Sequence, residues 1–166
     1  MKPDLIGSFV YKGSTITAEW FDITSKDQIP DLPWQGIYAV CNLDGKIPFV
    51  YSSDGISKIP GGRTDQSESV EETLRREIQE ELNCKIMSWI PIGYQKNFNG
   101  GELGSCQLRV YAAIEKNGEF KKDPAGTVIG YRLIELSELG DTIKWNKIGY
   151  RVQHIVEKMF DNGISS

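Results

Sequence analysis

A chain of 166 residues with 39% hydrophobic and 25% charged residues has the size and composition of one soluble globular domain. Its formal net charge of −4 argues against a groove that binds nucleic acid by bulk electrostatics, so a nucleic-acid partner is not expected. The sequence shows no signal peptide and no apolar run of about 18 residues, so we do not expect membrane insertion.

The cysteines indicate the compartment. Cys41, Cys84 and Cys106 are odd in number and lack the close spacing of a metal site. We therefore expect a reduced, cytoplasmic protein.

The first half of the chain predicts two pairs of strands. Residues 8–20 indicate two strands around a turn at Lys12-Gly13, and residues 36–41 and 47–51 indicate a hairpin across Asp44-Gly45. The segment at about residues 1–35 has two alternative roles: it covers a sheet edge, or it pairs with a second subunit in a homodimer.

A helix is predicted at roughly residues 67–82. Asp65 or Ser67 can cap its start, and Asn83 can close it in the left-handed conformation. One apolar stripe recurs every four residues, at Val70, Leu74, Ile78 and Leu82.

The glutamates at Glu77, Glu80 and Glu81 do not all fit an ordinary solvated surface. On a wheel of about 100° per residue, Glu77 and Glu81 fall against or within the edge of the apolar stripe, whereas Arg76 lies on the outer face. Ion pairs four residues apart explain the outer face but not carboxylates at the core boundary. Crowded carboxylates repel and need a cation, and oxygen ligands favour Mg²⁺ or Mn²⁺ over zinc.

The second half of the chain predicts further strands and a final helix. Residues 86–96 and 105–115 indicate two strands joined by a glycine-rich loop, and residues 131–134 a short strand. The last helix has an apolar face formed by Ile148, Val152, Ile155, Val156 and Met159. Strands between two helices predict an α/β fold, an α/β/α sandwich with a mixed β-sheet.

The segment from Gly62 to Cys84 resembles the box of the Nudix hydrolase family. That box reads glycine, five residues, glutamate, seven residues and then R-E-U-x-E-E-x-G-U, where U is aliphatic. Gly62, Glu68 and the run REIQEELNC from Arg76 match every charged position. Asn83 replaces the usual glycine and Cys84 the aliphatic residue, and neither change touches the metal or acid–base chemistry. The resemblance implies a single Nudix domain over residues 1–166, with the extra strand segment at about residues 1–35.

The resemblance also assigns roles by position. Catalytic residues would be Glu77, Arg76, Glu80 and Glu81. The metal ligands would be Glu77, Glu80, Glu81 and the carbonyl of Gly61, with Mg²⁺ or Mn²⁺ as cofactor. Gly62 and Glu68 would be structural, with Glu68 pairing with Arg76.

The general base is left open between Glu77 and an acid from a later part of the chain. The later candidates are Glu102, Glu115, Glu119 and Asp123. Glu102 lies in the glycine-rich loop, which is either mobile enough to reach the site or an ordinary hairpin tip.

The implied activity is metal-dependent hydrolysis of a pyrophosphate bond in a nucleoside diphosphate linked to another group, a small-molecule nucleotide. Two alternatives are a non-catalytic nucleotide-binding or regulatory module and a prenyl-diphosphate isomerase of the same fold. The module is disfavoured because the box acids are all present, and the isomerase because the chain has one histidine.

No substrate-binding residue is assigned from the sequence. Aromatic residues that could stack on a nucleobase are Trp34, Tyr94, Phe98 and Trp145, although most aromatic residues belong to a core. We expect His154 and the pair Lys121-Lys122 to lie at the surface.

Overall fold

The structure is a computed structural model that describes residues 1–123 and 126–163. Its strands are β1 Leu5–Tyr11, β2 Ser14–Asp22, β3 Trp34–Asn42, β4 Ile47–Ser52, β5 Ser57–Lys58, β6 Gly61–Gly62, β7 Cys84–Asn99, β8 Glu102–Lys116 and β9 Val128–Ile134. Its α-helices are α1 Val70–Leu82, α2 Leu139–Ile143 and α3 Lys147–Asp161.

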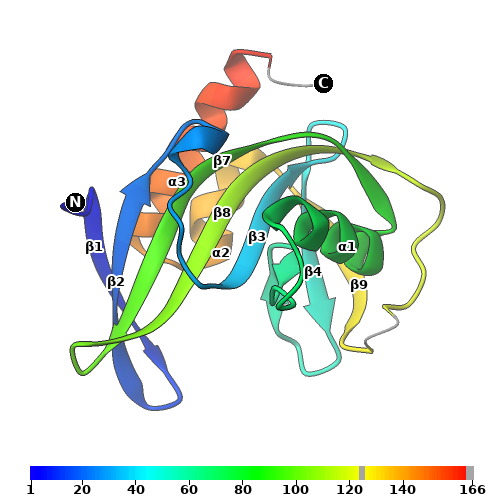
Figure 1. Cartoon of the computed structure of the whole chain (residues 1–166). Helices are drawn as coiled ribbons and strands as arrows, with labels where there is room; N and C mark the ends of the chain where they lie inside the picture. The colour runs from blue at the N-terminus through cyan, green and yellow to red at the C-terminus, as the bar shows by residue number, and fades with distance from the viewer. Residues whose placement is uncertain (124–125, 164–166) are drawn as a thin grey trace.

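The strands form a six-stranded sheet in the order β1-β2-β7-β8-β3-β6 and a three-stranded sheet in the order β5-β4-β9. The larger sheet is mixed, because β3 runs parallel to β8 whereas the other neighbours are antiparallel. One core cluster packs the apolar stripe of α1 against the sheet, and a second core cluster contains the buried face of α3. Helices therefore cover both faces (Figure 1), which confirms the predicted α/β/α sandwich.

The predicted box helix starts too early by about one turn. Residues 65–68 form a turn instead, in which the backbone N–H of Glu68 donates to the carbonyl of Asp65 at 3.0 Å. The cap is Ser69, whose hydroxyl accepts from the N–H of Glu72 while the Glu72 carboxylate accepts from the N–H of Ser69. The helix begins at Val70 because this reciprocal pair satisfies its first backbone donors.

The end of α1 agrees with the sequence. Asn83 has φ 50° and ψ 46°, which confirms the left-handed closing residue. The Asn83 side chain also forms two hydrogen bonds. Its Nδ2 donates to the carbonyl of Glu119 at 2.7 Å, and its Oδ1 accepts from Nε2 of Gln79 at 2.6 Å. Asparagine thus provides contacts that glycine could not.

The predicted hairpin across Asp44-Gly45 is only partly right. The turn is present, with positive φ at both residues, and Leu43 pairs with Lys46 across it. The strands then separate, because β3 joins β8 in the larger sheet and β4 joins β5 and β9 in the smaller one. Residues 43–46 therefore link the two sheets.

The N-terminal hairpin extends the larger sheet. β2 pairs with β7 along residues 16–22, and Trp20 is fully buried. Asp22 forms an ion pair with Arg151 of α3, which ties this edge to the helical layer.

No helix in residues 1–123 and 126–163 is long and apolar enough to cross a membrane. A homodimer stays a prediction.

Candidate active site

The last turn of α1 lies against β6 and buries a carboxylate there. Glu81 is 3% exposed, and its Oε1 accepts a hydrogen bond from the N–H of Gly61 at 2.7 Å. The ammonium of Lys58 donates to the carbonyl oxygen of Gly61 at 2.6 Å and lies 3.2 Å from Oε2 of Glu81. A cation thus sits between the two oxygen donors that the box pattern assigned to a metal.

Burial has the largest effect on the pKa values of the carboxylates Glu77 and Glu81 in this site. It raises the pKa of Glu81 to about 7, and repulsion from Glu77 adds to the rise, while Lys58 and the N–H of Gly61 oppose it. Burial also raises the pKa of Glu77, against the attraction of Arg76 and Lys58, and Glu80 adds repulsion. Among the three box carboxylates, Glu80 thus raises the pKa of Glu77 by repulsion, and Glu77 raises the pKa of Glu81 in the same way.

Arg76 ties the loop before α1 to the helix. Its Nε and Nη2 donate to the two carboxylate oxygens of Glu68 at 2.6 and 3.0 Å, and Nη2 also donates to the carbonyl of Arg63 at 3.0 Å. Hydrogen bonds from Arg76 lower the pKa of Glu68 to about 2. The predicted pair is present, and it holds the loop in place.

The helical wheel misplaces the head of Arg76. Its backbone lies on the outer face, but its Nη1 reaches Glu77 Oε1 at 2.9 Å and Glu80 Oε2 at 3.4 Å. A long side chain can reach beyond its own sector of the helix, so Arg76 neutralises part of the box charge.

Two glycines allow the loop to approach the carboxylates. Gly61 has φ +136°, and a Cβ there would collide with the backbone of β3 at Ile37 and Tyr38. A Cβ at Gly62 would collide with the carboxylate of Glu77. Both positions therefore need glycine for close approach as well as for conformation.

The residues fit a hard divalent cation in their chemistry. Within the described ranges, no three histidine, cysteine, aspartate or glutamate side chains form a group that could hold a metal. The Lys58 ammonium nevertheless marks a cation position between the Gly61 carbonyl and Glu81, and both donors are oxygen atoms, which Mg²⁺ and Mn²⁺ prefer. Convergence of all three glutamates on one ion stays a prediction.

Glu102 lies far from the box. It occupies the first position of β8 beside Gly100 and Gly101, at an exposed hairpin tip. Tyr38 is in register with both Gly61 and Arg109, and Glu102 is seven residues from Arg109, about 23 Å along the strand. The structure therefore supports the hairpin-tip interpretation of this loop.

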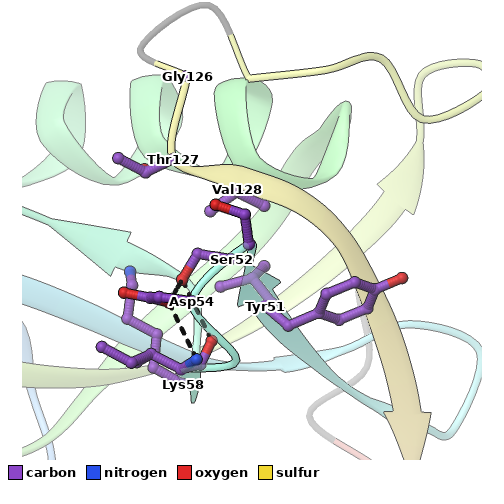
Figure 2. A pocket seen from close by; sticks show the side chains of 10 residues that line it. Tyr51, Ser52, Asp54, Lys58, Gly126, Thr127 and Val128 are labelled. Carbon is purple, nitrogen blue, oxygen red and sulfur yellow. Dashed lines mark hydrogen bonds between the residues drawn. The ribbon is translucent and has the colours of Figure 1, made fainter.

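Two cavities meet at Lys58. The larger, of about 430 Å³, lies on the α3 face of the larger sheet and is lined by Tyr38, Gln95, Asn97, Arg109 and Trp145, among others. The smaller, of about 300 Å³, lies between the β4–β5 connection and the start of β9. Figure 2 shows this smaller cavity, where the Asp54 carboxylate accepts from the Ser52 hydroxyl at 2.7 Å and from the N–H of Ile56 at 3.0 Å.

The aromatic residues that could stack on a nucleobase differ in whether they line a cavity. Of the four named from the sequence, Trp145 lines the larger cavity. Tyr94 is buried and stacks on Phe21, and Trp34 packs edge-on against Tyr94. Phe98 is half-buried in β7 and does not line the cavity.

The residues that were predicted to lie at the surface do so in the structure. His154, Lys121 and Lys122 are exposed.

Sequence reasoning missed Lys58, Tyr38 and Arg109. One signal was available: Gln107 and Arg109 alternate with apolar residues along β8, and Gln95 and Asn97 are two positions apart on β7. Polar residues at a period of two mark one face of a strand, and here that face lines the cavity.

Comparisons with known proteins identify the family and the fold. The NUDIX domain family matches residues 35–153. The pyrophosphohydrolase BsRppH of Bacillus subtilis is similar in structure, with a TM-score of 0.65, 22% identity and coverage of 95% of this chain and 98% of that one. An ADP compounds hydrolase is similar with a TM-score of 0.56, 13% identity and coverage of 98% and 97%.

A MutT protein, described for Aliivibrio salmonicida and Vibrio cholerae, is similar with a TM-score of 0.53, 14% identity and coverage of 72% and 94%. No match was found among curated proteins. The family match spans more than two thirds of the chain and includes the whole box. The chain therefore belongs to the Nudix family.

Proposed function

We propose that the chain is a divalent-cation-dependent pyrophosphohydrolase that cleaves a nucleoside diphosphate linked to another group, X. The observation that carries the proposal is the buried Glu81 carboxylate, held by the N–H of Gly61 and sharing a cation with the Gly61 carbonyl. The names of the similar structures, a pyrophosphohydrolase and an ADP compounds hydrolase, support the same reaction class.

The residues that would hold the cofactor are Glu77, Glu80, Glu81 and the Gly61 carbonyl. When bound, Mg²⁺ or Mn²⁺ would neutralise the pyrophosphate and lower the pKa of an attacking water. Arg76 and Glu68 keep the loop in register with α1 during the reaction.

Proton transfer and positioning fall to two further side chains. Glu77 is the general base that we assign, because it lies against Gly62 beside the Glu81–Gly61 pair, and burial raises its pKa, which makes it a better proton acceptor than an exposed glutamate. Lys58 lies where the two cavities meet, so its ammonium can bind a phosphate oxygen with one part of the substrate in each cavity.

The substrate is a small nucleotide, because a cavity of about 430 Å³ is of the size that takes a small molecule. The cytoplasm is the compartment that we assign, and the three cysteines, all buried and free of disulfides, support it.

Substitution of box acids tests the proposal. With Mg²⁺ or Mn²⁺ and a panel of nucleoside triphosphates, nucleotide sugars and dinucleoside polyphosphates, the wild type should release phosphate or a nucleotide. Glu80→Gln or Glu81→Gln should lower kcat by at least about a hundredfold while the protein stays folded, because each removes an oxygen charge that would face the cation.

Glu71→Gln is the matched control on the same helix. Glu71 is half-buried and pairs with the exposed Arg75, away from the box carboxylates, so its substitution should leave kcat within about twofold. Equal losses in Glu71→Gln and Glu81→Gln would contradict the site. Stabilisation by nucleotides without any turnover would indicate a binding module instead.

A further inference from the structure

Arg109 is a buried cation whose surroundings differ from those of the other arginines in this site. It is 3% exposed on β8, and its guanidinium lies between two aromatic rings, 4.8 Å from the centre of Tyr38 and 4.5 Å from that of Trp145. Contacts with two aromatic rings restrict the guanidinium, and its N–H donors remain available for polar contacts.

The N–H donors of this guanidinium are only partly satisfied. Nη2 donates to Oε1 of Gln107 at 2.6 Å, and Nη1 makes a long contact of 3.5 Å with the carbonyl of Leu108. Nε is buried without an acceptor. No carboxylate in the described part of the chain forms an ion pair with Arg109, whereas Arg75 and Arg151 each have one and Arg76 has three.

The side chain keeps its charge despite this environment. Burial lowers the pKa of Arg109 to about 10, so the group is still a cation at neutral pH. A buried charge without a counter-ion is costly, and such groups are normally paired. The missing partner is therefore the unusual feature of this residue.

The cavity beside Arg109 has the charge to receive an anion. Its described lining contains three cations, Arg109, Lys144 and Lys58, the last paired with Glu81, and three side-chain amides, but no aspartate or glutamate. The whole chain, by contrast, carries a net charge of −4. A locally positive, partly apolar cavity in an acidic protein favours an anionic ligand.

The position of Arg109 separates this anion from the reacting bond. Gly61, Tyr38 and Arg109 lie in register on three adjacent strands, so Arg109 is about 10 Å from Gly61 across the sheet. That span is about the length of a sugar or nucleoside unit.

We propose that Arg109, held between Tyr38 and Trp145, is a specificity-determining residue that binds a second anionic group of the substrate, a phosphate or a carboxylate, about one sugar unit from the bond that is cleaved. The inference rests on the proposed function, because it places the remainder of the substrate in the cavity next to Lys58. It is independent of which metal serves the box.

Matched substrate pairs test this selectivity. NADPH with NADH and coenzyme A with dephospho-coenzyme A differ by one phosphate, and UDP-glucuronate with UDP-glucose by one carboxylate. For at least one pair, the wild type should favour the charged member by about tenfold or more in kcat/KM, mainly through KM, since hydrogen bonds to a charged group have that strength. The pair that responds distinguishes phosphate from carboxylate.

Arg109→Met keeps much of the side-chain volume and removes the charge. It should reduce the preference to about twofold or less, while kcat for the uncharged member stays within about threefold. Arg132→Met, at an exposed position of β9, is the control and should keep the wild-type preference. Loss of activity on both members alike, or an unchanged preference in Arg109→Met, would overturn the inference.

Two further measurements keep the outcomes separate. Arg109→Met should melt at the wild-type temperature or above it, because it removes an unpaired buried charge, and a large drop would show that the arginine is structural. If that variant does not fold, Arg109→Lys, which keeps a charge without the planar fork, should retain only part of the preference; full retention would contradict the assignment.

Binding without metal separates this inference from the proposed function. In EDTA, the charged member of the responding pair should raise the wild-type melting temperature more than its partner, and Arg109→Met should abolish that difference. If the wild type hydrolyses no probe but shows the Arg109-dependent difference in binding, the proposed function fails and the inference stands. If the wild type hydrolyses the probes without any preference for the charged members, the proposed function stands and the inference about Arg109 fails.

Discussion

The protonation of Glu81 gives the metal-free protein a defined pH dependence. A glutamate has a pKa near 4.5 when the chain is unfolded, and burial raises the pKa of Glu81 to about 7 in the fold. Between these values the folded protein retains a proton that the unfolded chain has released, so stability falls as pH rises through that window. The full loss, about 3 kcal/mol, is present above pH 7.

Glu81→Gln should remove this dependence, because glutamine resembles the protonated acid. In EDTA, the difference in free energy of unfolding between Glu81→Gln and wild type should be small near pH 4.5 and grow in favour of the variant up to about pH 8. Urea denaturation at several pH values measures it. A difference that shrinks with rising pH would mean that Lys58 outweighs burial at this carboxylate.

The start of α1 shows what local sequence can and cannot determine. Asp65, Ser67 and Ser69 are all suitable caps within five residues, and the apolar stripe does not choose among them. The choice depends on Glu68, whose carboxylate accepts from Arg76, from the Thr73 hydroxyl and from the N–H of Asp65. These contacts fold residues 65–68 into a turn and leave Ser69 to begin the helix.

Ser69→Ala should therefore lower the free energy of unfolding by about 1 kcal/mol, since it removes the acceptor for the N–H of Glu72. For a chain of this size the melting temperature should fall by about 2 to 4 °C. Ser67→Ala is the control and should change stability by less than about 0.5 kcal/mol. If the two variants lose the same stability, the reciprocal cap does not determine where the helix begins.

At the scale of the whole molecule, the N-terminal hairpin is part of the core although the family match begins at residue 35. Trp20 is fully buried, its ring packs on Gly93 of β7, and its indole N–H donates to Asp22 at 2.7 Å. Trp20→Ala should cost about 3 to 5 kcal/mol in urea denaturation, because it leaves a large cavity between β2, β7 and the α3 layer.

Tyr11→Ala provides the comparison at the exposed end of the same hairpin and should cost less than about 0.5 kcal/mol. If Trp20→Ala were equally mild, the hairpin would be an appendage on the sheet edge rather than part of its core.

The sequence predicted those features that depend on neighbours along the chain. These include the stripe of α1, the left-handed Asn83, the turns of both long hairpins and the Glu68–Arg76 pair of the box. It could not predict the pairing of β3 with β8, whose residues are about 70 positions apart, or the parting of β3 from β4. Such contacts depend on burial of the whole sheet, so strand patterns alone do not determine them.

The same limit explains why the larger cavity was missed. Tyr38, Arg109 and Trp145 come from β3, β8 and the segment before α3, and they meet only after the sheet has formed. The box, by contrast, lies within one loop and one helix, so its residues can be recognised from their spacing in the sequence.

Lys58 gives the site a counter-ion of its own. Its ammonium balances Glu81 and covers the Gly61 carbonyl, while Arg76 balances Glu77 and Glu80. Folding of this chain therefore does not have to wait for a divalent ion, unlike that of small domains that are unfolded without their metal. Under the proposed function, newly synthesised protein would complete its fold first and bind its divalent ion afterwards, so metal starvation would leave a folded but inactive protein rather than a misfolded one.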